Sequence, residues 1–308
     1  MRSARRFYRL SLALGAAGAI VVALSVAVAL RSINLAAPSL GQLLRACQEV
    51  VLSSETTTSI VVLAFTGVGL AVASLAVRSL RAHYRAQQLA LSGLNVQEQT
   101  DHRGIPVTVF AHRRPQAFCA GLLHPRIYLS SGAIETVPAT ELDAVLEHEA
   151  HHCARRDPLR VLIVQVLGDS LFFLPLMSRL RERYSALAEL AADESAVART
   201  GDRSALAAAL MTFASTPEPG VMGIAPESVD HLLGESPRWQ LSASLLTGAL
   251  ITLAGVLAGA LTLARAANPG TLSLAVLSAQ ACMVAMVVVP VMLGASVVLV
   301  THRSRSAA

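Results

Sequence analysis

The stretch LDAVLEHEAHHCARRDP, residues 142–158, decides the fold in the middle of the chain. Its apolar residues recur at helical spacing, and Thr140 is a candidate N-cap with Asp143 three positions further on. Asp157 and Pro158 end this helix and begin the next one, with Asp157 as N-cap and Pro158 in the first turn. The sequence therefore predicts one helix from about Thr140, followed directly by a second.

This helix carries a metal-binding pattern. His148-Glu149-Ala150-His151-His152 fits H-E-x-x-H. Residues four apart lie on one helix face, so His148 and His152 can present two imidazole nitrogens to one metal ion. Glu149 lies beside the first ligand, where it can accept a proton from metal-bound water. His151 lies off this face and is interpreted as a flanking residue. The alternative is a chance pentapeptide whose imidazoles only form hydrogen bonds.

A later helix, predicted over residues 178–200, supplies a third candidate ligand. Glu189 and Asp193 lie four apart on one face of this helix. A catalytic zinc site needs a third protein ligand and an open position for water. We expect Glu189 to be that ligand, and Asp193 to accept a hydrogen bond from the outer nitrogen of a ligating histidine. The alternative is an ordinary pair of exposed acids beside nearby Arg residues.

Between these helices, residues 160–177 are apolar enough to be a fifth membrane span. A crossing would move the Arg residues between 179 and 238 to the opposite side of the membrane. The segment also carries Gln165 and Asp169 one turn apart on one face, which a lipid-facing helix would avoid. We predict a buried or interfacial helix that turns back near Pro175. Glu189 can reach the histidines only in that arrangement.

Outside the middle region the apolar residues come in blocks. The chain is 54% hydrophobic and only 15% charged, which is not the composition of an ordinary soluble domain. Runs long enough to cross a bilayer occupy residues 10–30, 59–77, 241–263 and 272–300, and Pro290 predicts a kink or tilt in the last. We therefore expect four transmembrane helices. A cleaved signal peptide is the alternative for the first run, because four Arg residues precede it, although the run is long for that purpose.

The distribution of Arg predicts the orientation. All 25 Lys and Arg positions are Arg, and the net charge is +5. With four spans and the N-terminus inside, Arg31, Arg45 and Arg265 lie outside, and the remaining 22 of the 25 lie inside or at the inner boundary. Because cytoplasmic loops carry the excess of basic residues, we expect a multi-pass plasma-membrane protein with both termini and the metal site cytoplasmic. No basic helix is interleaved with aromatic residues, so nucleic acid is not an expected partner.

The cysteines give no sign of a disulfide framework. Cys47, Cys119, Cys153 and Cys282 show neither paired nor metal-type spacing. A cytoplasmic middle region would also keep its thiols reduced. We therefore expect no structural disulfide.

The order of these motifs resembles a known family. Residues 142–158, then an apolar helix ending near a Pro, then ELAADESAV at 189–197, resemble the BlaR1/MecR1-type membrane peptidases, the M56 family. The wider kin are the HtpX/Ste24-type M48 gluzincins. GLLHPRIYLSSG, residues 121–132, is similar to the stretch that precedes the metal helix in that group. The resemblance covers about residues 107–209, a third of the chain.

The resemblance implies roles for individual residues. It implies one zinc ion bound by His148, His152 and Glu189, with Glu149 as catalytic base. Asp193 would hydrogen-bond a ligating histidine. Asp157 matches the family's acidic residue after the histidines, and its capping role and a site role both remain open.

The resemblance and the spans together predict a mainly α membrane protein in three parts. Residues 1–80 hold the first pair of transmembrane helices. Residues 81–238 form a cytoplasmic, gluzincin-like zinc peptidase domain with a small β element. Residues 239–308 hold the second pair and a short tail. Because the chain ends soon after the last span, where the best-known relatives carry a penicillin-binding sensor, β-lactam sensing is not expected.

The small β element lies upstream of the metal helix. After a polar linker at residues 97–104, strands are predicted at 107–110 and 127–129. In kin of this family the strand before the metal helix binds substrate by edge pairing, and here that strand would lie within residues 117–121.

The expected function is that of a membrane-embedded, zinc-dependent endopeptidase acting on a protein or peptide at the cytoplasmic face. The resemblance implies regulatory cleavage of a transcriptional repressor or of the chain itself. A non-catalytic, zinc-stabilised scaffold or signalling adaptor is the alternative, but such a site has no use for Glu149. A transporter is disfavoured because the spans contain almost no ionisable residues. Tyr184 and His231 are candidates for oxyanion stabilisation, but neither is assigned that role.

Overall fold

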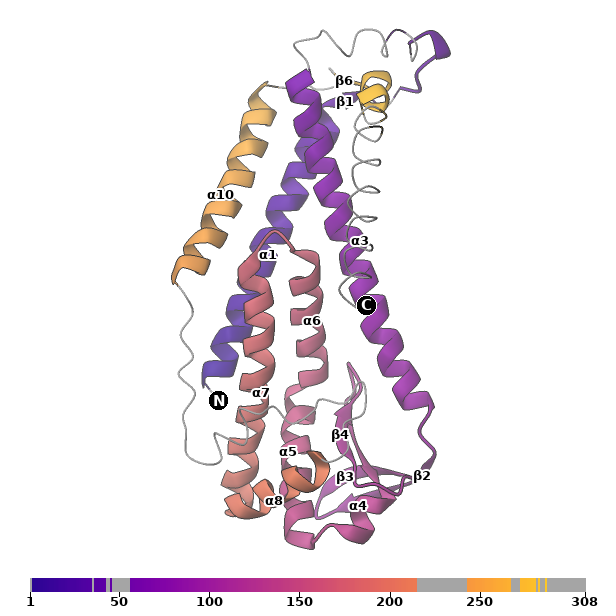
Figure 1. Cartoon of the computed structure of the whole chain (residues 1–308), viewed down its shortest axis with the longest axis vertical. Coiled ribbons are helices and arrows are strands. Elements are labelled where there is room, and N and C mark those ends of the chain that lie inside the picture. The colour runs from indigo at the N-terminus through magenta and orange to yellow at the C-terminus, as the bar shows by residue number, and fades with distance from the viewer. Residues whose placement is uncertain are drawn as a thin grey trace, which may run out of the picture. The chain divides into compact units, whose positions relative to one another are not determined.

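The computed structural model describes residues 2–34, 36–42, 45, 56–214, 243–266, 272–280, 282 and 286 (Figure 1). The chain divides into two compact units. Unit 1 comprises Met1–Ala17 and Val72–Leu250, and unit 2 comprises Gly18–Ala71 and Ile251–Ala308. The proposed metal ligands all belong to unit 1.

Three helices in the described part of the chain are long and apolar enough to cross a membrane. They are α1 (Arg2–Arg31), α3 (Thr56–Ser92) and α10 (Ala243–Ala266). Each contains one of the apolar runs found in the sequence, so the prediction of a mainly helical membrane protein is confirmed. The expected fourth span, residues 272–300, lies mostly outside the described residues.

Unit 2 has a small apolar core of its own. Ala29 of α1, Val62 of α3, Leu263 of α10 and Leu277 are buried together. A short parallel pairing of β1 (Ile33–Asn34) with β6 (Leu272–Ser273) completes the described part of this unit.

Unit 1 contains a four-stranded sheet in the order β2-β3-β5-β4. Its strands are β2 (Val96–His102), β3 (Ile105–Phe110), β4 (Ala117–Ala120) and β5 (Arg126–Ser130). β3 and β5 pair in parallel, while β2–β3 and β4–β5 are antiparallel. The predicted strands at 107–110 and 127–129 are confirmed as parts of β3 and β5. The strand β4 occupies one edge of the sheet, and β2 the other.

The prediction of a polar linker at residues 97–104 is wrong, because most of these residues form the edge strand β2. This strand is exposed along nearly its whole length, so it has no apolar face to produce the alternation that predicts a strand. Its turn to β3 runs through Arg103 and Gly104, both at positive φ.

One face of the sheet packs against α5 (Ala139–Arg155). Val107, Ile127 and Leu129 are buried against Leu142 and Leu146 of this helix. The remaining members of the cluster come from the short helix α4 (Ser131–Thr136) and the residue that follows it: Ala133 and Val137. This packing fixes the metal helix on the sheet.

The predicted N-cap of α5 is wrong. Pro138 precedes the first helical residue, and no side chain caps that end. The carboxylate of Asp143 instead faces the β2–β3 turn, where it pairs with Arg103 and lies 2.9 Å from His102 Nε2. Asp143, which the sequence pattern assigned to helix capping, thus forms an ion pair with a residue distant in the sequence.

The second predicted cap is also wrong. Arg156, at a φ of 53°, caps α6 (Asp157–Ser170), and Asp157 is the first helical residue. Pro158 lies in the first turn, as predicted. The carboxylate of Asp157 turns away from its own backbone toward α5.

The segment at residues 160–177 is divided between two helices. α6 ends at Ser170, and α7 (Pro175–Thr200) begins after a tight turn closed by a bond from Leu174 N to Leu171 O. Figure 1 shows α6 and α7 as a hairpin, and α7 packs against both α5 and α6. The chain therefore reverses direction here, and α7 returns beside the metal helix. The helix α8 (Arg203–Ala214) follows and packs against α5.

The first turns of α1 also belong to unit 1. Ala4 and Phe7 pack against Leu187, Leu190 and Ala191 of α7. The N-terminal turns of α1 therefore support the helix that carries Glu189.

The expectation of no disulfide is wrong in the structure. Cys119 of β4 and Cys153 of α5 are bonded, and their Cα atoms lie 5.9 Å apart. Their separation of 34 positions hides the pairing in the sequence. The two cysteines meet because β4 lies against α5.

Candidate metal centre

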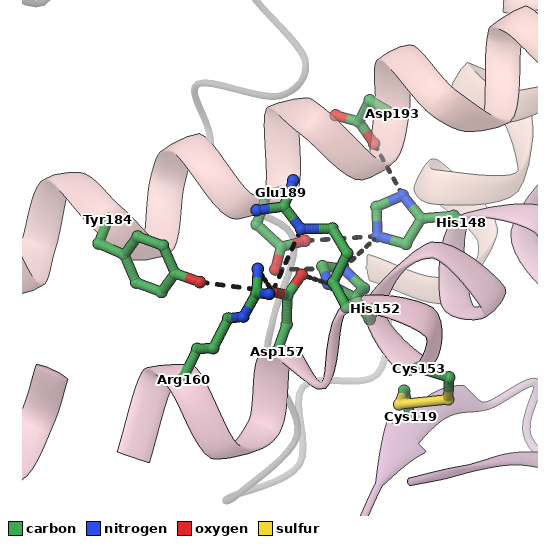
Figure 2. A network of polar contacts seen from close by, with 10 residues as sticks. Cys119, His148, His152, Cys153, Asp157, Arg160, Tyr184, Glu189 and Asp193 are labelled. Atoms are coloured by element: carbon green, nitrogen blue, oxygen red, sulfur yellow. Dashed lines mark hydrogen bonds and ion pairs between the residues drawn. A yellow bond between two sulfur atoms is a disulfide. The ribbon is translucent and has the colours of Figure 1, made fainter. Parts of the chain in front are cut away.

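Three buried side chains from two helices converge in unit 1. His148 and His152 lie on α5, and their Nε2 atoms are 3.1 Å apart. Glu189 on α7 places Oε2 3.4 Å from His148 Nε2 and Oε1 3.6 Å from His152 Nε2 (Figure 2). Zinc bonds to nitrogen and oxygen of about 2.0–2.1 Å put two tetrahedral ligands about 3.3 Å apart. The observed spacings therefore suit a single metal ion.

The bonding state of Glu189 supports the same interpretation. Its Oε1 atom is buried and has no hydrogen-bond partner among the described residues. A buried carboxylate oxygen without a partner is costly, so such groups require an explanation. Coordination of a metal ion would satisfy this oxygen, and the two imidazoles and one carboxylate are the ligand types that zinc prefers.

Each histidine meets a buried carboxylate on its other nitrogen. His148 Nδ1 lies 2.9 Å from Asp193 Oδ1, and His152 Nδ1 lies 3.0 Å from Asp157 Oδ2. Both aspartates are only 1% exposed. Such a partner holds the ring in the tautomer whose Nε2 faces the metal. The sequence left the capping and site roles of Asp157 open, and in the structure its carboxylate contacts His152 rather than capping α6.

Asp157 also lies at the centre of a network that the sequence did not indicate. The hydroxyl of Tyr184 donates to its Oδ1 over 3.4 Å, and the guanidinium groups of Arg155 and Arg160 lie 3.7 and 3.9 Å from the same oxygen. The rings of Tyr8 on α1 and Tyr184 pack in a tilted arrangement with their centroids 5.4 Å apart, and Arg160 lies over the ring of Tyr8. Aromatic and basic residues so far apart in the sequence gave no spacing from which this network could be inferred.

Of the two oxyanion candidates, Tyr184 lies within the described residues. The hydroxyl of Tyr184 points at Asp157, as Figure 2 shows. His231 lies outside the described residues.

Glu149 lies between the metal helix and the sheet edge. The backbone of Cys119 on β4 lies close enough to its carboxyl group to lower the pKa slightly. Burial raises the pKa of this carboxyl group, and it outweighs the lowering by His148 and His152. A raised pKa makes the carboxylate a stronger base, which suits a group that must take a proton from water.

In the absence of a metal, the other groups of the site shift one another's pKa values. Burial lowers the pKa of His148, but the bonds to Asp193 and Glu189 outweigh it and raise the value to about 9. His152 is raised well above its ordinary pKa for similar reasons. Burial raises the pKa of Glu189, yet the two histidines outweigh it and lower the value to about 2. The metal-free site therefore keeps an ionised carboxylate beside protonated imidazoles, and a metal cation would replace those protons.

Comparison with known proteins adds to this geometry. The family model described as BlaR1 peptidase M56 matches residues 45–226, which include all three converging side chains. A protein named Protease HtpX homolog from Acaryochloris marina (strain MBIC 11017) is 27% identical over 234 residues, covering 59% of this chain and 78% of that protein. No solved structure matches.

Proposed function

Because the chain belongs to the BlaR1 peptidase M56 family of membrane proteases, we propose that it is a zinc-dependent endopeptidase acting at the cytoplasmic face of the plasma membrane. The observation that carries this proposal is the buried triangle of His148, His152 and Glu189 beside Glu149. The excess of Arg on one side of the predicted spans supports the cytoplasmic orientation.

In this proposal His148, His152 and Glu189 hold the zinc ion. The ion would supply a Lewis acid for the scissile carbonyl and lower the pKa of water. Glu149 accepts the proton of the attacking water and returns it to the leaving amine. Asp193 and Asp157 hold the two imidazole rings in the orientation that ligation needs.

The strand β4 is the proposed site for substrate. One of its edges pairs with β5, and it occupies the end of the described sheet. An extended peptide can add to such an edge through main-chain hydrogen bonds. Because Cys119 of this strand is bonded to Cys153, one helical turn after Glu149, a peptide paired there would lie near the proposed base.

The proposed substrates are proteins or peptides. The regulatory role implied by the family resemblance is cleavage of a transcriptional repressor or of the chain itself. Cleavage at the cytoplasmic face would give the enzyme access to either.

The test compares hydrolysis of fluorescein-labelled β-casein by the full-length protein in detergent, before and after chelation and after return of zinc. Chelation should abolish turnover and zinc should restore it. Glu149→Gln should lower turnover roughly 10²–10⁴-fold, the usual contribution of a general base. Glu147→Gln is the matched control, because Glu147 lies on the same helix and pairs with Arg199 instead.

Equal hydrolysis in the wild type, the chelated protein and Glu149→Gln would contradict the proposal. One bound zinc ion per chain without turnover in any sample would instead favour the zinc-stabilised scaffold.

A further inference from the structure

A disulfide joins the proposed substrate strand to the metal helix. It links Cys119 of β4 to Cys153, which directly follows the proposed ligand His152 (Figure 2). Cys153 also lies four residues after Glu149, on the same face of α5. This covalent bond therefore lies beside both the proposed base and a proposed ligand.

The bond and the proposed orientation are compatible only if the bond is reversible. Disulfides are rare in the cytoplasm, and those that form there are usually transient and catalytic or redox-sensing. The Arg distribution favours a cytoplasmic site. Both cysteines are half-buried rather than fully enclosed, and a regulatory thiol must be reachable by small thiols.

We propose that Cys119 and Cys153 are a redox modification site at which a low-molecular-weight disulfide, such as oxidised glutathione, turns the peptidase off. The inference rests on the proposed function. One cysteine attacks the reagent and forms a mixed disulfide, releasing one glutathione thiol. The second cysteine then displaces the other glutathione. The protein loses two electrons and two protons, and the reagent gains them as two thiols.

The position of the bond explains why the oxidised state is the inactive one. The bond holds β4, a strand of four residues, against α5 one helical turn from Glu149. A peptide that pairs with β4 needs that strand to adjust, and the attacking water needs Glu149 to be accessible. Reduction removes the covalent restraint on β4, so the strand can move away from α5 and release the base.

The experiment uses the full-length protein in detergent, equilibrated either with tris(2-carboxyethyl)phosphine or with oxidised glutathione. Mass spectrometry verifies the bond, and zinc content is measured in both samples. Zinc-dependent hydrolysis of β-casein should be about tenfold faster in the reduced sample. Zinc content should be equal, because neither cysteine belongs to the proposed ligand set. Returning the reduced sample to oxidised glutathione should lower the rate again.

Variants separate this bond from general thiol effects. Cys153→Ser cannot form the bond and should hydrolyse casein at the same rate under both conditions. Cys282→Ser is the matched control, because Cys282 is an exposed free cysteine outside unit 1, and this variant should keep the full redox response.

Equal rates in the two states, with the bond verified, would overturn the inference. A bond that forms in growing cells and resists the reductant in the folded protein would overturn it as well. If neither state shows zinc-dependent hydrolysis, the proposed function fails, and hydrogen–deuterium exchange of the β4 amides decides the inference separately. Faster exchange in the reduced protein supports the release of β4, and equal exchange contradicts it.

Discussion

At the scale of single residues, the candidate metal centre depends on two carboxylates that contact the outer nitrogens of the imidazoles. Asp193 and Asp157 lie 2.9 and 3.0 Å from the outer nitrogens of His148 and His152. Both aspartates are buried, so water cannot replace them as partners. The affinity of the site for zinc should therefore depend on residues that are not ligands.

Asp193→Asn tests this dependence. The amide cannot hold the imidazole of His148 as a carboxylate does, so zinc affinity should fall about 10–100-fold. Competition with a chromogenic chelator measures the affinity. Glu194→Gln is the control, because Glu194 is the next residue on the helix and is exposed. A loss of the same size in both variants would show that the effect is general to α7.

The pKa values predict how pH acts on the metal-free protein. The pKa of His148 rises from 6.5 to about 9 on folding, because Asp193 and Glu189 outweigh the effect of burial. A raised histidine pKa stabilises the fold fully below 6.5, and this contribution disappears as the pH rises through about 9. His152 shifts in the same direction. The metal-free protein should therefore become less stable between pH 6.5 and 9.

Zinc should reverse this trend, since binding releases the imidazole protons. Thermal unfolding in detergent, followed with and without zinc, measures both effects. The increase in Tm on adding zinc should grow from pH 6.5 to 9. A metal-free Tm that rises across this range would show that the imidazoles are not protonated as described.

At the scale of the elements, the first turns of the helix α1 support the candidate metal centre. The ring of Tyr8 packs against the ring of Tyr184 and lies under Arg160. Tyr184 and Arg160 both approach the carboxylate of Asp157. The chain of contacts ends at His152. The N-terminal turns of α1 should therefore influence the position of one proposed ligand.

Tyr8→Ala should weaken zinc binding by up to about tenfold, whereas Tyr8→Phe should bind zinc normally because the contacts use the ring. Arg9→Gln is the control, because Arg9 is the exposed neighbour on the same helix. Zinc affinity and casein hydrolysis measured on the same samples check the effect. Normal zinc binding by Tyr8→Ala would show that α1 does not position the ligand.

The elements differ in how far the sequence predicts them. The helix with His148 and His152 and the one with Glu189 have strong helical spacing, and both form. The strand β2 escaped prediction because it is an exposed edge without an apolar face. Neither predicted helix cap forms, and the carboxylates of Asp143 and Asp157 pair with His102 and His152 instead. Local patterns describe the elements, but they do not reveal contacts between residues distant in the sequence.

At the scale of the whole molecule, the account depends on which side of the membrane each segment occupies. Three described helices can span a bilayer, and the excess of Arg favours a cytoplasmic metal site. The disulfide between Cys119 and Cys153 was missed because it depends on the packing of β4 against α5. The bond makes the orientation important. A disulfide on the cytoplasmic side would be transient, whereas one on the outer side would persist.

Cysteine labelling tests the orientation directly. With the four native cysteines replaced by Ser, a membrane-impermeant maleimide should label Leu40→Cys on intact cells but not Glu135→Cys. Both positions are exposed in the structure. Permeabilised cells should show labelling at both. Labelling of Glu135→Cys on intact cells would place unit 1 outside and make the disulfide a permanent feature.

The central claim is that one zinc ion, held by His148, His152 and Glu189, works with Glu149 to cleave peptide bonds. Zinc content and casein turnover measured on the same samples of the wild type, Glu189→Ala and Glu149→Gln test it most directly. The account predicts one zinc ion and turnover in the wild type, loss of both in Glu189→Ala, and retained zinc without turnover in Glu149→Gln. Turnover at the wild-type rate in either variant would contradict it.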